Sequence, residues 1–153
     1  MKKAASFSSR FVFHLTGDLI MFNKVSHIGI AVKDLQASVE LFSSLFGKQP
    51  DHVEDVPDQK VKTAIFTVGS SSIELTQGTD SSSPVTRFLE KRGEGVHHLS
   101  FVVDDIEREL TRLKGAGFQL VDERPRIGAD GYLVAFLHPQ STNGVLIEIS
   151  QKK

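Results

Sequence analysis

The chain has 153 residues, of which 39% are hydrophobic and 24% are charged, as in an ordinary globular domain. Its formal net charge of -1 provides no overall basic field for nucleic acid, and no stretch approaches the ~20 apolar residues of a membrane helix. The absence of cysteine excludes disulfides, zinc–thiolate sites and thiol nucleophiles. We therefore expect neither a nucleic-acid nor a membrane partner, and a metal site would have to use His, Asp or Glu.

Residues 1–20 differ from the rest of the chain, because they are basic, rich in Ser and Phe, and contain no acidic residue before Asp18. Three interpretations stay open: a targeting segment, since transit peptides share this composition, an artefact of an upstream start site, or a loosely packed extension. We treat residues 1–20 as an N-terminal extension and residues 21–151 as one domain. The expected location is the cytoplasm, or the mitochondrial matrix if the extension is a transit peptide.

An internal repeat organises residues 21–151. The segment VSHIGIAVKDL (25–35) aligns with VHHLSFVVDDI (96–106) at a constant offset, which places His27 on His98 and Asp34 on Asp105. Two copies of a unit this long are typical of one pseudo-symmetric domain rather than of a solenoid.

A helical pattern follows each copy of the repeat. Apolar residues recur at near-helical spacing, and these are Leu35, Val39, Phe42 and Phe46 in the first half and Ile106, Leu110 and Leu113 in the second. Gly47 and Gly115 end the two patterns. Asp104, followed three residues later by Glu107, predicts a capping pair at the start of the second helix.

Further strands complete each half. They are expected at 61–68 and 72–76 in the first half, and at 119–122, 133–138 and 145–150 in the second. Between the halves, Ser83 as N-cap and Pro84 at the first helical position predict a short linker helix over residues 83–92. The chain therefore divides into two similar modules, about 24–78 and 95–151, each reading as a strand, a helix and further strands.

Four polar side chains occupy equivalent strand positions in the two modules. Because strand side chains alternate between faces, His27 and His98 point away from their bulky neighbours, and small residues such as Gly29 share their face. Glu74 and Glu148 likewise lie opposite the apolar residues on either side of them. The bulky face suits packing against the helices, and the other face leaves room for a ligand.

A carboxylate between two apolar strand residues is costly to bury unpaired, and metal coordination removes that cost. Taken singly, each of these residues is more often structural than a ligand, but their repetition in both modules favours a shared site. Two imidazoles and two carboxylates suit Co²⁺, Mn²⁺, Fe²⁺, Ni²⁺ or Zn²⁺. We predict that His27, Glu74, His98 and Glu148 bind one divalent metal ion. His97 points the other way and is expected to be packed or hydrogen-bonded.

The chain resembles a known family over residues 24–151. The matching segments are HIGIAVKDL (27–35), SPVTRFLEKRGEGVHHLSFVVDDI (83–106), ERPRIGADG (123–131) and FLHPQSTNGVLIEI (136–149). They are similar to the vicinal oxygen chelate (glyoxalase) superfamily and, within it, to the methylmalonyl-CoA epimerases. The resemblance implies an α+β fold in which tandem βαβββ modules form a curved mixed sheet, a cup around the metal. It also implies a homodimer, a CoA thioester substrate, Co²⁺ as the first expectation for the metal, and a place in propionate metabolism.

Carried over residue by residue, His27, His98 and Glu148 match the family's metal ligands, and Glu74 matches a fourth position held by Gln or Glu. The implied reaction interconverts (R)- and (S)-methylmalonyl-CoA by 1,1-proton transfer through a metal-stabilised enolate, with Glu148 as one base. Some relatives place a second glutamate where this chain has Thr63, which is no base at neutral pH. Glu74 is therefore the second catalytic candidate, with a water or a metal-bound group as alternatives.

Other functions of the same scaffold stay open. A glyoxalase I-type lyase can use the same four residues with a glutathione hemithioacetal, and an extradiol dioxygenase would use His27, His98 and Glu148 with Fe²⁺. A protein that sequesters a small molecule, as resistance proteins do, would need no metal. The segments PRIGADG (125–131) and HPQSTNGVLIEI (138–149) favour the epimerase.

Overall fold

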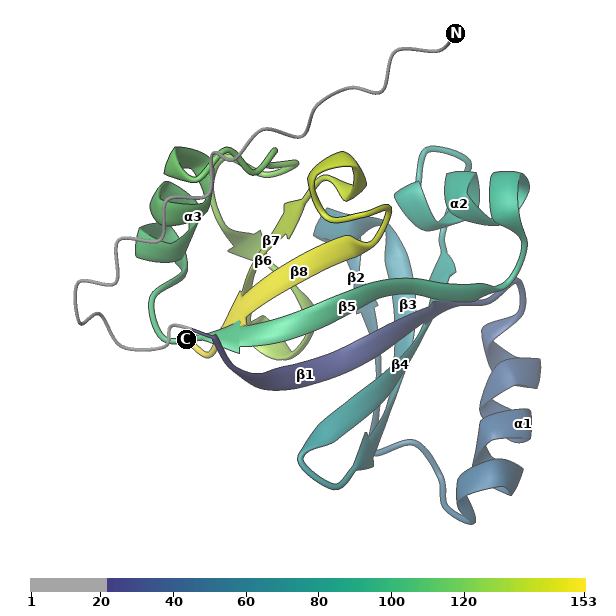
Figure 1. Ribbon diagram of the computed structural model, residues 1–153. Helices are drawn as coiled ribbons and strands as arrows, with labels where there is room; N and C mark the ends of the chain where they lie inside the picture. The colour runs from purple at the N-terminus through teal and green to yellow at the C-terminus, as the bar shows by residue number, and fades with distance from the viewer. Residues whose placement is uncertain (1–21) are drawn as a thin grey trace, which may run out of the picture.

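The computed structural model describes residues 22–153, so the predicted extension over residues 1–20 lies outside the described residues. Within the described part, one mixed eight-stranded sheet curls into a half-barrel, with strand order β2-β3-β4-β1-β5-β8-β7-β6 (Figure 1). The predicted α+β fold, a curved mixed sheet with helices, is confirmed. No helix among these residues is long and apolar enough to cross a membrane.

The helices and strands follow the same order in both halves. The first half contains β1 (Phe22–Ala31), α1 (Leu35–Phe46), β2 (His52–Val56), β3 (Val61–Val68) and β4 (Ser71–Gly78). The second contains β5 (Gly95–Val103), α3 (Ile106–Gly115), β6 (Arg126–Ile127), β7 (Leu133–Leu137) and β8 (Leu146–Gln151), and α2 (Pro84–Arg92) lies between the halves. In each half the first strand pairs in parallel with the last one, β1 with β4 and β5 with β8.

The two halves join through β1 and β5, which pair antiparallel within one chain. The pair Ile28 and Leu99 lies at the centre of this pairing, flanked by His27 opposite Ser100 and by Gly29 opposite His98. His27 is equivalent to His98, and Gly29 is equivalent to Ser100, so the order of equivalent residues is reversed across the pair of Ile28 and Leu99. A local two-fold axis therefore relates the two strands. The histidine of each half consequently lies next to a small residue of the other half.

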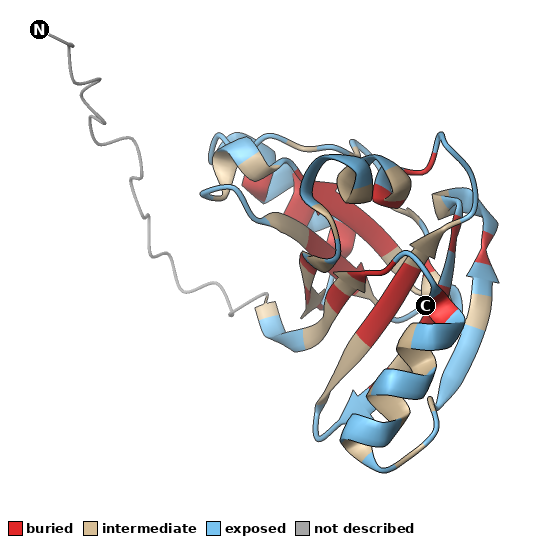
Figure 2. Cartoon of the chain, turned by 90° about the vertical axis from the view of Figure 1, so that its right-hand side faces the viewer, coloured by how far each residue is buried: buried red, intermediate tan, exposed pale blue. Residues whose placement is uncertain are grey.

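Apolar side chains hold the helices against the sheet. Helix α1 covers one buried cluster on the convex face, which includes Phe66 and Leu75, and α3 covers a second one, which includes Leu137 and Ile149. Helix α2 packs through Val85 at one end of the concave face. Figure 2 shows buried residues gathered along the central strands, whereas the outer sides of the helices are exposed. The middle of the concave face is left for polar side chains.

The N-terminal ends of α1 and α3 are capped in the same way. The Asp34 side chain accepts a hydrogen bond from the Ala37 N–H, and the Asp105 side chain accepts one from the Arg108 N–H. The predicted pair of Asp104 and Glu107 is therefore wrong by one residue: Asp104 instead accepts a hydrogen bond from the Asn23 side chain.

Two edge strands differ from the prediction. Residues 119–122 form only an isolated bridge between Leu120 and Leu137, and β6 is the edge strand of that half. In the first half β2 was not predicted, because its exposed, charged sequence HVEDV reads as a loop. An edge strand needs hydrogen bonds on one side only and little apolar burial, so hydrophobic periodicity does not reveal it.

Candidate active site

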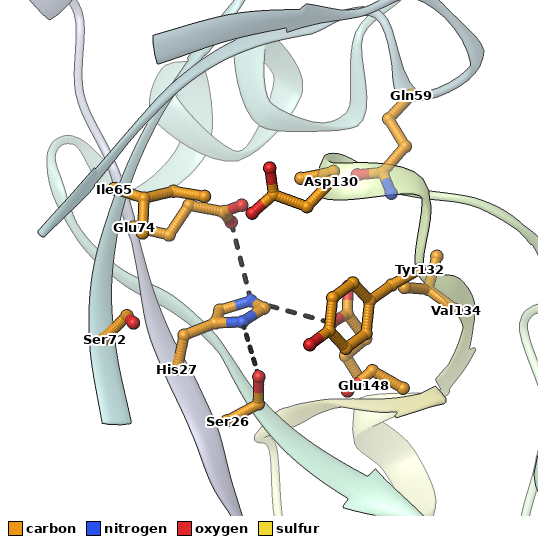
Figure 3. A pocket seen from close by; sticks show the side chains of 12 residues that line it. Ser26, His27, Gln59, Ile65, Ser72, Glu74, Asp130, Tyr132, Val134 and Glu148 are labelled. Carbon is orange, nitrogen blue, oxygen red and sulfur yellow. Dashed lines mark hydrogen bonds and ion pairs between the residues drawn. The ribbon is translucent and has the colours of Figure 1, made fainter. Parts of the chain in front are cut away.

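The four candidate ligands converge on the concave face, each from one of the four central strands of the sheet. The Nε2 atoms of His27 and His98 lie 2.9 Å apart. The Glu74 Oε2 atom is 3.6 Å from each of these nitrogens, and the Glu148 Oε1 atom is 3.6 Å from the Nε2 atom of His27. Figure 3 shows the two carboxylates reaching the His27 ring from different sides. The structure thus brings all four predicted site residues together.

Small side chains beside the ligands explain how four large polar groups fit. A Cβ atom added to Gly29 would lie 2.1 Å from Cε1 of His98, so only glycine leaves room for that ring. The equivalent position in the other half is Ser100, whose hydroxyl donates a 2.6 Å hydrogen bond to Oε1 of Glu148. The Thr76 hydroxyl donates to Oε2 of Glu74 over 3.2 Å. Sequence reasoning missed Ser100 and Thr76, although each lies two residues from a ligand, on the same face of its strand.

Burial sets the protonation of the site. Desolvation, together with the charges of His27 and His97, holds the pKa of His98 well below its ordinary value, so its ring is neutral, as a metal ligand requires. Desolvation raises the pKa of Glu148 to about 7, and the charge of Glu74 adds to this rise, which His27 and Ser100 partly oppose.

The donor set fits one divalent cation. The ligand atoms of His27, Glu74 and His98 all lie within 4.8 Å of one another, and Oε1 of Glu148 faces the same His27 nitrogen. Glu74 and Glu148 are 7% and 3% exposed, so the site gathers two carboxyl groups with little access to water. A dication bound between them would balance their charge, and imidazole nitrogens with carboxylate oxygens suit a first-row transition metal.

A cavity opens onto this cluster. Besides His27, Glu74 and Glu148, it is lined by Ser26, Gln59, Ile65, Ser72, Ala129, Asp130, Tyr132, Val134 and Ser150. The two edges of the sheet meet at its mouth, where the Asp130 N–H donates to Oε1 of Glu54 over 2.7 Å and Oδ1 of Asp130 lies 3.2 Å from Nε2 of His52. Glu54 and Asp130 were not singled out from the sequence, because 76 positions separate them along the chain.

Two other residues considered in the sequence lie beside the site. Thr63 is 2% exposed on β3, between Glu54 and Thr76, and its hydroxyl has no hydrogen-bond partner among the described residues. His97 is packed and hydrogen-bonded, as predicted: its Nδ1 atom lies 3.0 Å from Nδ1 of His98, and its ring meets the Phe88 ring edge-on at 4.8 Å. Burial lowers the pKa of His97 to about 4.

Comparisons with known proteins agree with this architecture. The family profile of the glyoxalase/bleomycin resistance protein/dioxygenase superfamily matches residues 26–136. An uncharacterised protein of Bacillus subtilis is 40% identical over 131 residues, which are 86% of this chain and 94% of that protein. The ethylmalonyl-CoA/methylmalonyl-CoA epimerase of Cereibacter sphaeroides is 37% identical over 133 residues, 86% of this chain and 99% of that protein.

Solved structures extend the comparison. A variant of the Streptomyces coelicolor methylmalonyl-CoA epimerase, in complex with 2-nitronate-propionyl-CoA, superposes with a TM-score of 0.83 at 33% identity, covering 86% of this chain and 95% of that one. The chain therefore belongs to the glyoxalase/bleomycin resistance protein/dioxygenase superfamily and, within it, to the methylmalonyl-CoA epimerase family. The resemblance inferred from the sequence motifs is confirmed.

Proposed function

We propose that the protein catalyses the interconversion of (R)- and (S)-methylmalonyl-CoA by 1,1-proton transfer through an enolate. The observation that carries this proposal is the convergence of His27, Glu74, His98 and Glu148 from the central strands of both halves, at the foot of an open cavity. Relatives that share most of this chain are named methylmalonyl-CoA epimerases, which supports the substrate assignment.

One divalent metal ion would be held by these four residues. Co²⁺ is the first expectation, and Mn²⁺, Ni²⁺, Zn²⁺ and Fe²⁺ suit the same donors. When bound, the ion supplies Lewis-acid stabilisation of the negative charge that develops on the substrate's oxygens. The neutral ring of His98, and the missing side chain at Gly29 that makes room for this ring, prepare the protein side of the site.

Glu148 is the first base. Burial raises its pKa to about 7, which suits a group that takes and returns a proton near neutral pH. The hydroxyl of Ser100 holds Oε1 in place and thereby orients the carboxyl group toward the cavity that it lines. Glu148 removes the α-proton on one face of the substrate and leaves an enolate.

Glu74 was predicted as the second base, and its position argues for a different main duty. Its Oε2 atom lies 3.6 Å from the Nε2 atoms of both His27 and His98, at the centre of the ligand group. A carboxylate that binds a cation is a weakened base, because the cation favours its ionised form. This weakens Glu74 more than Glu148, because Glu148 faces the His27 nitrogen from outside the tight group of His27, Glu74 and His98. Glu74 is better suited to hold the metal than to shuttle protons.

The test is to incubate each purified epimer of methylmalonyl-CoA with the protein before and after treatment with a chelator. We expect interconversion of the epimers, its loss after chelation, and its recovery with Co²⁺ or another of the named ions. A metal-loaded protein that leaves both epimers unchanged and converts methylglyoxal with glutathione would instead be a glyoxalase I-type lyase. Oxygen consumption with catechols would indicate a dioxygenase, and metal-free protein that binds a hydrophobic ligand tightly would indicate sequestration.

Two accompanying expectations stay predictions. The first is the homodimer, which sedimentation equilibrium tests. The second is the location, the cytoplasm or the mitochondrial matrix, which depends on residues 1–20 and which fractionation of cells that express the full chain tests.

A further inference from the structure

Inversion at the α-carbon needs a proton removed from one face and a proton delivered to the other. Glu148 serves one face. At the position where some relatives carry a second glutamate, Thr63 has only a hydroxyl and does not line the cavity, and Glu74 belongs to the ligand group. Inversion of the substrate in this cavity therefore requires a further acid–base group outside the metal site.

Asp130 is the carboxylate in that position. It lies in the short turn Ala129–Gly131 before β7 and lines the same cavity as Glu74 and Glu148. In Figure 3 its side chain points from the turn toward the Glu74 carboxylate, whereas the Glu148 carboxylate lies on another side of the His27 ring, behind Tyr132. Asp130 is not a member of the His27, Glu74 and His98 group, so a metal ion bound by that group would not weaken Asp130 as a base in the way it weakens Glu74.

Contacts from the opposite sheet edge fix Asp130 in place. Its backbone N–H donates to Oε1 of Glu54 over 2.7 Å, and its Oδ1 atom lies 3.2 Å from Nε2 of His52. Its backbone has a φ of 53°, in the left-handed region that Asp and Asn tolerate better than most residues. The Asp130 side chain is 49% exposed, so its carboxylate exchanges protons with solvent directly. The contacts with Glu54 and His52 aim the carboxylate.

We propose that Asp130 is the second acid–base residue of the site, with His52 as the residue that positions its carboxylate; this inference rests on the proposed function. In one direction the Glu148 carboxylate takes the α-proton, and the bonding pair stays on the substrate as the enolate. Protonated Asp130 then donates its proton to the other face, which forms the new C–H bond. Asp130 regains a proton from solvent, and Glu148 releases the proton that it took. The opposite direction exchanges the two roles.

The experiment follows each epimer in D₂O with the metal-loaded protein, measuring both interconversion and deuterium exchange at the α-carbon. For Asp130→Asn we expect interconversion to fall by about 10²–10⁴-fold, the usual contribution of a general acid or base. Exchange of the one epimer whose α-proton faces Glu148 should persist. Glu148→Gln should show the reciprocal pattern, with exchange of the other epimer only. His52→Gln should slow exchange of the same epimer as Asp130→Asn and leave the other epimer unaffected.

A matched control is Asp55→Asn, which removes a carboxylate from β2, the strand that carries His52 and Glu54; this carboxylate pairs with Lys62 and does not line the cavity. It should leave both readouts unchanged. The fold of Asp130→Asn is expected to survive, because Asn tolerates the left-handed backbone, and its metal content should equal that of the wild type. Asp130→Gly provides a second variant, in which added formate should restore part of the lost interconversion.

Unchanged interconversion in Asp130→Asn would overturn the proposal, as would equal losses of exchange for both epimers. Failure of the proposed function gives a different result: the wild type itself would then neither interconvert nor exchange either epimer when loaded with metal.

Discussion

Gly29 on β1 lies directly opposite His98 on β5, and the absence of its side chain gives the imidazole its place. Replacing Gly29 by Ala would put a Cβ atom 2.1 Å from the ring, so the ring or the strand must move. We expect Gly29→Ala to weaken metal binding by about 10- to 100-fold, as changes around metal ligands commonly do. Titration of the chelator-treated protein with Co²⁺ measures the effect.

The control for this substitution is Gly115→Ala at the end of α3, where an added Cβ would meet nothing within 4 Å. This variant should bind metal like the wild type and gain up to about 1 kcal/mol in free energy of unfolding, because alanine favours helix more than glycine does. Equal metal affinity of Gly29→Ala and the wild type would show that His98 does not depend on this space.

Equivalent positions in the two halves have different roles in the site. Gly29 and Ser100 occupy equivalent positions, yet the first makes room for a histidine and the second holds Glu148 through a 2.6 Å hydrogen bond. The equivalence could be predicted from the aligned motifs. Their different roles could not be predicted, because each role depends on which side chain of the other half lies opposite the position.

At the scale of elements, helix α2 packs on β5 over a partly buried histidine. The His97 ring packs edge-on against Phe88 of α2, and burial lowers its pKa from 6.5 to about 4. Between these values the unfolded chain binds a proton that the folded protein does not. The contribution of His97 to stability is therefore present above pH 6.5 and is lost as the pH falls below it.

This linkage predicts that the free energy of unfolding falls by about 2 kcal/mol more in the wild type than in His97→Asn between pH 7.5 and pH 5, at about 1.4 kcal/mol per pH unit. Urea unfolding of both chelator-treated proteins at the two pH values measures it. Parallel losses in the two proteins would mean that His97 is not the group responsible.

Strands that bury one face could be predicted from the sequence, whereas segments at the edges of the sheet could not. The expected strand at 61–68 coincides with β3, because Ala64 and Phe66 give it a buried face. By contrast, β2 is a charged edge strand, and residues 119–122 pair only through Leu120. β2 and the turn Ala129–Gly131 meet at the mouth of the cavity, so the part of the site that they supply could not be predicted from the sequence.

At the scale of the whole molecule, both halves of the site come from one chain. β1 pairs with β5 of the same chain, and this pairing brings His27 beside His98. We therefore expect one metal ion per chain at every protein concentration, whether or not the predicted homodimer forms. Metal analysis alongside sedimentation equilibrium over a dilution series checks this. A fall in metal content on dissociation would show that a second chain completes the site.

The sequence by itself determined the repeat, the α+β fold and the four polar residues that face one side of the strands, because a period of two and a repeated motif are local patterns. Only the tertiary structure decided how these residues meet. Closure of the sheet brings Asp130 of one half against His52 and Glu54 of the other, although 76 positions separate Asp130 from Glu54. Such a contact depends on the curvature of the whole sheet, which no local pattern specifies, and it places the proposed second base at the mouth of the cup.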